Sequence, residues 1–214
     1  MSGRQVALTL HAALLIGALF LLVPWLTRWH PQYGYLFALT ACWLFFCLPV
    51  IGLYALPGND DGRLFSERLA WRNWWILPLL LAQVALVAAV SFVPNTSILT
   101  SGGMWLAILI AGINGPLEEM AWRGGFLAAF RNRPRLGFWL GWALFAAWHL
   151  PLALSQGLVF EGGPLTLIGG AAALGLFWSW VAWRTGSVFY VALAHTLTNV
   201  FAFWVLFDRN GFTA

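Results

Sequence analysis

The chain alternates long apolar runs with short polar segments. Seven runs approach or exceed the roughly 20 residues that a helix needs to cross a bilayer. They span residues 6–26, 33–56, 74–93, 104–130, 136–154, 164–183 and 187–207. An open sheet cannot satisfy its backbone hydrogen bonds in hydrocarbon, so we expect every run to be a helix. The pattern predicts an all-α polytopic membrane protein, with about seven transmembrane helices in one bundle.

The composition favours the same environment. Of the 214 residues, 61% are apolar and 8% are charged, whereas an average soluble domain has about 25% charged residues. So few charged residues cannot provide the hydrated polar surface of a soluble domain of this length. All eleven basic residues are arginines, and ten of them are scattered over the segments between the predicted spans, which excludes a nucleic-acid partner that binds a basic cluster.

The arginine distribution predicts the orientation. With the N-terminus in the cytoplasm, eight arginines fall on inner segments and two on outer segments, as the positive-inside rule requires. Seven spans then place the C-terminus outside. The first run follows Arg4 as in a signal peptide but is longer than the usual apolar region of one, so we expect an uncleaved anchor. We expect a multi-pass protein of a bacterial inner membrane.

Two shorter features complete the outline. The longest inner loop, residues 57–72, alternates charged and apolar side chains and predicts a short amphipathic helix on the cytoplasmic surface. Cys42 and Cys47 lie five residues apart in one apolar run. That spacing fits neither a zinc site nor a disulfide, so we expect two buried thiols.

Three charged residues lie inside one predicted span, where each costs roughly 2.5–3.5 kcal/mol. They are Glu118, Glu119 and Arg123. Glu119 and Arg123 are four residues apart with the acid first, which is the favourable order for an ion pair on a helix. Glu118 lies about 100° around the helix from Glu119. We therefore expect one carboxylate to be neutralised and the other to remain available for chemistry.

Polar residues of two further spans reach a similar depth. Phe145 and His149 lie one turn apart in the span 136–154, and His195 and Asn199 lie one turn apart in the last span. Counting about 1.5 Å per helical residue from the neighbouring turns brings both pairs close to the layer of Glu118.

Irregular backbone is predicted beside this layer. Asn114 precedes Glu118 by one turn on the same face, and Pro116 and Pro151 each interrupt the hydrogen bonds of a helix. A freed carbonyl at membrane depth is tolerated only in protein or beside water. We therefore expect these residues to border one hydrated pocket.

The residue types in this layer suit amide hydrolysis without a covalent intermediate. Glu118 can act as general base on a water molecule with help from His149, and His195 and Asn199 can donate hydrogen bonds to the developing oxyanion. None of the motifs contains a serine or cysteine as an obvious nucleophile.

Three motifs in this order resemble one family. EExxxR at Glu118, Glu119 and Arg123, FxxxH at Phe145 and His149, and HxxxN at His195 and Asn199 are similar to those of the CAAX-protease and bacteriocin-processing family of intramembrane glutamic-type endopeptidases. The resemblance covers residues 114–207, somewhat under half of the chain. It implies that Glu118 and His149 activate water, that His195 and Asn199 form the oxyanion site, and that Glu119 and Arg123 support Glu118.

The resemblance divides the chain into two parts. Residues 1–103 hold three transmembrane helices and the loop helix, and residues 104–214 hold the four helices of the catalytic core. The expected partners are the lipid bilayer and a membrane-tethered peptide or protein substrate, which we expect to enter from the lipid or the outer face. The oligomeric state is not determined by these patterns.

The same residues raise the question of a cofactor. Two Glu and two His side chains are potential zinc ligands. However, Glu119 is paired with Arg123 and the HExxH motif is missing. We therefore expect no cofactor and the metal-free glutamate mechanism that the resemblance implies, with a zinc mechanism as the alternative.

Two other functions remain open. One is a non-catalytic scaffold or immunity protein of the same family. The other is a transporter or proton relay, since intramembrane Glu, Arg and His residues also serve proton transfer. Cleavage assays on Glu118→Ala and His149→Ala separate these functions from a protease.

Overall fold

The computed structural model describes residues 1–213, and no β-strand occurs in that range. Six helical segments are long and apolar enough to cross a membrane: α1 (Gly3–Trp29), Pro31–Ala55, Trp71–Ile98, α7 (Pro134–Ala153), α8 (Pro164–Thr185) and α9 (Phe189–Arg209). The second contains α2 (Pro31–Cys42) and α3 (Leu48–Val50), and the third contains α4 (Ile76–Val87). The prediction of an all-α multi-pass membrane protein is confirmed.

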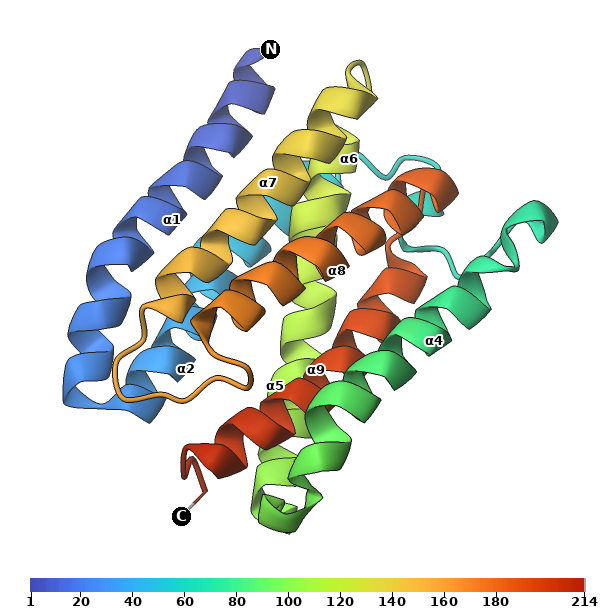
Figure 1. The fold of residues 1–214 in the computed structure, drawn as a ribbon. Coiled ribbons are helices and arrows are strands. Elements are labelled where there is room, and N and C mark those ends of the chain that lie inside the picture. The colour runs from blue at the N-terminus through green and yellow to red at the C-terminus, as the bar shows by residue number, and fades with distance from the viewer. Residues whose placement is uncertain (214) are drawn as a thin grey trace.

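A further long helix carries the three charged residues. It consists of α5 (Ser101–Glu118), π-helical turns over Glu119–Gly125 and α6 (Phe126–Ala129). It runs through the middle of the bundle (Figure 1), and it packs against α9, against the segment Ile51–Ala55 and against α7. With this helix the structure contains a counterpart of each of the seven predicted runs.

The helix ends follow from local chemistry. The Ser2 hydroxyl accepts a hydrogen bond from the Gln5 backbone N–H, and the Gln5 side chain accepts one from the Ser2 N–H, which forms a capping box for α1. Pro164 begins α8, where its missing N–H costs nothing. Gly186 ends α8 in the left-handed region, at φ 73°.

Close packing brings α5 and α9 together. A Cβ atom on Gly115 would lie 2.8 Å from the backbone nitrogen of Thr196 on α9, so only glycine allows this approach. Thr196 is the neighbour of His195, and Gly115 lies three residues before Glu118. The small residue therefore sets the distance between the two helices that carry these polar side chains.

The arginine-rich segments gather at one end of the bundle, and the two termini lie at opposite ends (Figure 1). The Gln5 side chain donates to the side-chain Oδ1 of Asn132 at 2.7 Å, and Arg131 donates to the backbone carbonyl of Gly58. The backbone N–H of Val188 donates to the Leu64 carbonyl at 2.8 Å. This clustering agrees with the arginine pattern, and the side of the membrane that it faces stays a prediction.

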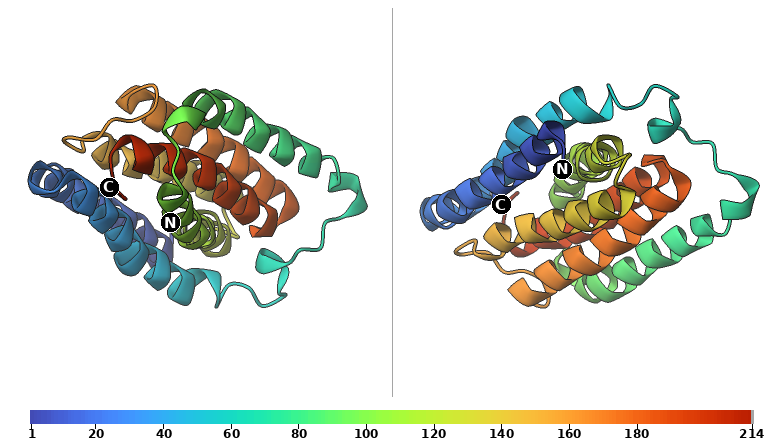
Figure 2. Two further views of the ribbon diagram at one scale, coloured as in Figure 1. Left: turned by 90° about the horizontal axis from the view of Figure 1, so that it is seen from below. Right: turned by 90° about the horizontal axis from the view of Figure 1, so that it is seen from above.

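The prediction of an amphipathic helix over residues 57–72 is wrong. Only a short 3₁₀ turn, Arg63–Phe65, and the start of another at Trp71 form there, and the segment runs as a loop outside the bundle (Figure 2). Gly62 adopts φ 68°. The carbonyls of Leu64, Ser66 and Glu67 accept hydrogen bonds from Val188, Ser187 and Tyr190. Contacts with the α8–α9 junction therefore replace the hydrogen bonds of a helix.

Candidate functional site

A buried charge cluster joins α9 to the π-helical turns that follow α5. One carboxylate oxygen of Glu119, Oε1, accepts a hydrogen bond from Nη1 of Arg123 at 2.9 Å. The same oxygen lies 2.8 Å from Nδ1 of His195. All three side chains are buried. The ion pair that the four-residue spacing predicts is thus present, and it includes a histidine that the spacing does not reveal.

Arg123 is fully held by two further helices. Its Nη2 donates to the carbonyl of Gly175 at 3.0 Å and its Nε to the hydroxyl of Ser179 at 3.3 Å, both on α8. The guanidinium carbon lies 3.8 Å from the centre of the Phe145 ring on α7. Each of the three guanidinium nitrogens thus donates a hydrogen bond, as a charge inside a membrane protein requires.

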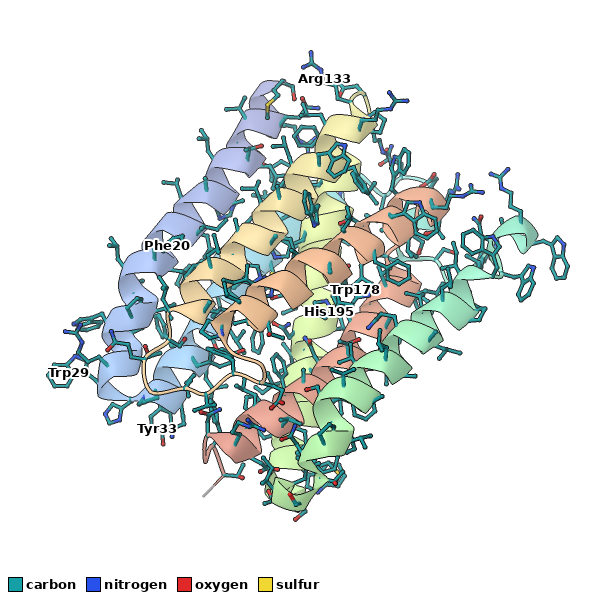
Figure 3. The ribbon with its side chains drawn as sticks, in the orientation of Figure 1. Phe20, Trp29, Tyr33, Arg133, Trp178 and His195 are labelled. Carbon is teal, nitrogen blue, oxygen red and sulfur yellow. The ribbon has the colours of Figure 1, made fainter. Side chains whose placement is uncertain are left out.

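An aromatic contact fixes the other side of His195. The Trp178 ring of α8 stacks on the imidazole, with 4.2 Å between the ring centres, and the two residues lie side by side at the centre of the bundle (Figure 3). The indole N–H of Trp178 donates to the side-chain Oε1 of Gln83 at 3.1 Å. The Gln83 amide in turn donates to the Thr198 hydroxyl at 2.9 Å.

Gln83 and Trp178 were missed by the sequence analysis. Gln83 is the one polar side chain of α4, and this isolation in an apolar helix is a signal that could have identified it. Trp178 has no such signal, because tryptophan is common throughout the chain and its contact with His195 joins two different helices.

Glu118 differs from every other charged residue of the cluster. It is 1% exposed, and neither of its carboxylate oxygens has a hydrogen-bond partner among residues 1–213. Its Oε2 lies 3.8 Å from Nε2 of His195, which is too far for a direct hydrogen bond. Glu118 is the last residue of α5 before the π-helical turns, and such turns often occur at functional sites.

His149 is connected to the cluster through Phe145. Its Nδ1 lies 2.9 Å from the Phe145 carbonyl oxygen. A carbonyl only accepts hydrogen bonds, so Nδ1 carries the proton and Nε2 of the neutral ring keeps its lone pair. The residue as a whole is of intermediate burial, and no other residue in the described range makes a hydrogen bond to Nε2.

The two predicted asparagines have different surroundings. Asn114 is buried and accepts a hydrogen bond from the indole N–H of Trp43 at 2.7 Å, so its oxygen is engaged by the segment after α2. Asn199 is partly buried on α9, one turn beyond His195. No other residue in the described range makes a hydrogen bond to the Asn199 side chain.

The four potential zinc ligands have different surroundings in the described residues. No group of three or more His, Cys, Asp or Glu side chains within residues 1–213 is arranged to hold a metal ion. The Glu119 oxygen closest to His195 is already shared with Arg123. Of the four potential zinc ligands, Glu119 and His195 are therefore engaged with each other.

One comparison with known proteins matches a family model to just under half of the chain. Residues 99–201 match the family model described as "Rce1-like: Type II CAAX prenyl endopeptidase Rce1-like". The predicted family is confirmed. The matched segment contains all three motifs and supports a protease at the general level, whereas Gln83 lies outside it. Neither the curated proteins nor the solved structures contain a significant match to the chain.

Proposed function

We propose that the protein is an intramembrane endopeptidase that hydrolyses a peptide bond of a membrane-associated or lipidated substrate. The observation that carries this proposal is the contrast within the EE pair. Glu119 is held by Arg123 and His195, whereas the buried carboxylate of Glu118 has no hydrogen-bond partner within the described residues. Burying a carboxylate without a partner in an apolar bundle costs free energy, so such a group indicates a functional role.

Glu118 is the proposed general base. Its free oxygens can accept a proton from a water molecule, whose hydroxide then attacks the carbonyl carbon of the scissile amide. The proton next passes from Glu118 to the nitrogen of the departing amine, so that one carboxylate serves both steps. The lone pair on Nε2 of His149 is suited to orient the same water.

His195 is the proposed partner of Glu118 in charge balance. The charges of Glu119 and Arg123 balance each other. One mobile proton shared by Glu118 and His195 then makes the whole buried cluster neutral. That proton resides either on Glu118 or on Nε2 of His195, whose separation from Oε2 of Glu118 is 3.8 Å. When His195 holds it, Nε2–H can donate a hydrogen bond to the oxyanion.

Asn199 is the proposed second donor to the oxyanion, because its amide lies one turn from His195 on α9 and makes no hydrogen bond within residues 1–213. One well-placed donor of this kind contributes roughly 2.7–4 kcal/mol of transition-state stabilisation. Glu119, Arg123 and Phe145 hold His195 and the helix in place and are proposed as positioning residues. No step of this proposal passes through a metal ion.

The proposed substrate class follows from the location and from the family. The matched family model is named for CAAX prenyl endopeptidases, whose substrates carry a lipid anchor. A site buried between membrane-spanning helices suits a peptide that is presented from the lipid or the outer face. We therefore propose a lipid-anchored or membrane-tethered peptide.

The test uses the purified chain in liposomes with fluorogenic peptides that are prenylated, acylated or untethered. The wild-type protein should cleave a tethered peptide, and Glu118→Ala and His149→Ala should each lower the rate by about 100-fold or more. Activity should survive exhaustive chelation. Unchanged cleavage by both variants, or loss of activity on chelation with recovery by zinc, contradicts the proposed mechanism.

A further inference from the structure

A polar cleft of about 570 Å³ lies apart from the charge cluster, between the loop 61–73 and the α8–α9 junction. Arg184, Thr185 and Ser187 form one wall, and the loop forms the other. Both elements are at the end of the bundle where the arginine-rich segments gather (Figure 1). Nothing in the proposed proteolysis uses this cleft.

Three hydrogen bonds fix the walls of the cleft. The Val188 N–H donates to the Leu64 carbonyl at 2.8 Å, the Ser187 hydroxyl to the Ser66 carbonyl at 2.7 Å, and the Tyr190 hydroxyl to the Glu67 carbonyl at 2.7 Å. Leu64, a residue of the loop, is also buried. The cleft is therefore preformed rather than a gap between independent loops.

The lining of the cleft has an excess of positive charge. Arg63, Arg68, Arg72 and Arg184 line it, against the two carboxylates of Asp61 and Glu67. Across the described part of the chain, none of these four guanidinium groups has a carboxylate within ion-pair distance. The Asp61 carboxylate accepts from the Arg63 backbone N–H at 3.2 Å instead. The guanidinium groups are left available for an anion.

A buried amide faces the same cleft. Asn73 lines it, is 4% exposed, and has a side-chain oxygen without a partner in the described range. Its side-chain nitrogen makes no hydrogen bond either within residues 1–213. A buried amide without partners is costly, and it gives the cleft a neutral donor beside the four cations.

The cleft lies at the level of a membrane surface. Trp71, Trp74 and Trp183 flank it along the chain and are exposed, Trp71 to 84%. Each lies at the end of a membrane-spanning segment, where tryptophan marks the headgroup layer. An anion that meets this cleft is therefore most abundant as a lipid headgroup.

We propose that the cleft binds the phosphodiester headgroup of an anionic phospholipid. Guanidinium groups make short, charge-assisted hydrogen bonds to phosphate oxygens, and basic pockets at the ends of membrane helices bind acidic headgroups. The side-chain nitrogen of Asn73 adds a neutral donor. Such a lipid would link the loop to the α8–α9 junction, and therefore to the start of the helix that carries His195.

The test measures lipid binding without any substrate, so its outcome is independent of the protease proposal. The intact protein in neutral detergent is titrated with phosphatidylglycerol and with phosphatidylcholine, and bound lipid is counted by native mass spectrometry. One phosphatidylglycerol should bind preferentially. The double variant Arg63→Gln/Arg184→Gln should weaken this binding on the order of tenfold or more.

A matched variant, Arg28→Gln/Arg133→Gln, removes two exposed arginines outside the cleft and should keep the wild-type preference. Inorganic phosphate and a peptide with a free terminal carboxylate serve as competitors. Equal binding of the two lipids, or an unchanged preference in the cleft variant, overturns the proposal. Displacement of phosphatidylglycerol by the peptide at concentrations where phosphate does not act also overturns it, in favour of a peptide site.

Discussion

The protein holds its arginines in two opposite ways. Arg123 lies in the middle of the bundle and is engaged by Glu119, by two groups of α8 and by the Phe145 ring. The four arginines of the polar cleft are exposed at the end of the bundle and have no carboxylate partner in the described range. The buried cation is satisfied by the chain itself, whereas the exposed cations are not.

The difference separates residues that stabilise the fold from residues that react with or bind another molecule. A charge that is taken out of water must be compensated within the protein, so the partners of Arg123 contribute to the stability of the fold. A polar group left without partners inside a preformed site indicates a role toward another molecule. Glu118 and Asn73 are such groups, one in each region.

The largest effect is expected at Arg123. The variant Arg123→Leu leaves Glu119 buried without its cation and should destabilise the fold by roughly 3–5 kcal/mol. The measurement is the unfolding midpoint of the purified protein in detergent. Arg133→Leu, at an exposed arginine, is the control and should unfold like the wild type. Equal midpoints for the two variants would mean that the buried cation carries no stability.

A smaller loss is expected where α5 meets α9. Gly115→Ala places a methyl group against the backbone of Thr196 and should cost roughly 1–3 kcal/mol, with a lower cleavage rate because Glu118 and His195 move apart. Gly112→Ala is a matched control, since a Cβ there has no atom within 4 Å. If the two alanines behave alike, the close approach does not position the site.

A still smaller effect is expected at Gln83, which touches Trp178 rather than the reacting atoms. Gln83→Leu removes the acceptor of the Trp178 indole N–H and should lower kcat about tenfold or less, with KM unchanged, because the stacked His195 is less well held. Steady-state kinetics with a tethered peptide give the two constants. Gln156→Leu, at an exposed glutamine, controls for the chemical change. An effect on KM alone would assign Gln83 to substrate binding.

The smallest effect on stability is expected in the cleft. Arg63→Gln/Arg184→Gln should change the free energy of unfolding by no more than about 0.5 kcal/mol in lipid-free detergent, because neither side chain has an ion-pair partner within the described residues. Chemical denaturation measures this value. A loss as large as that of Arg123→Leu would show that the cleft arginines are structural after all.

Much of the fold follows from local patterns. The seven apolar runs predict the seven long helices, because lipid requires apolar side chains over a length set by the bilayer. The Glu119–Arg123 ion pair follows from a spacing of four residues on one helix. Such predictions succeed where the interacting residues belong to one element.

Contacts between elements could not be predicted in this way. The hydrogen bond between Glu119 and His195, and the stacking of Trp178 on His195, join helices far apart in the sequence. The loop 57–72 has the pattern of an amphipathic helix, yet its carbonyls bond to residues of the α8–α9 junction. Tertiary partners decide both cases, and a single sequence does not display them.

The most direct test of the central claim replaces Glu118 by glutamine. Glu118→Gln keeps the shape of the side chain and removes the base, so cleavage of a membrane-tethered peptide by the reconstituted protein should fall by roughly 100- to 10,000-fold. Because the carboxylate has no partner within the described range, the unfolding midpoint should stay the same or rise. Wild-type cleavage by a folded Glu118→Gln variant would contradict the account.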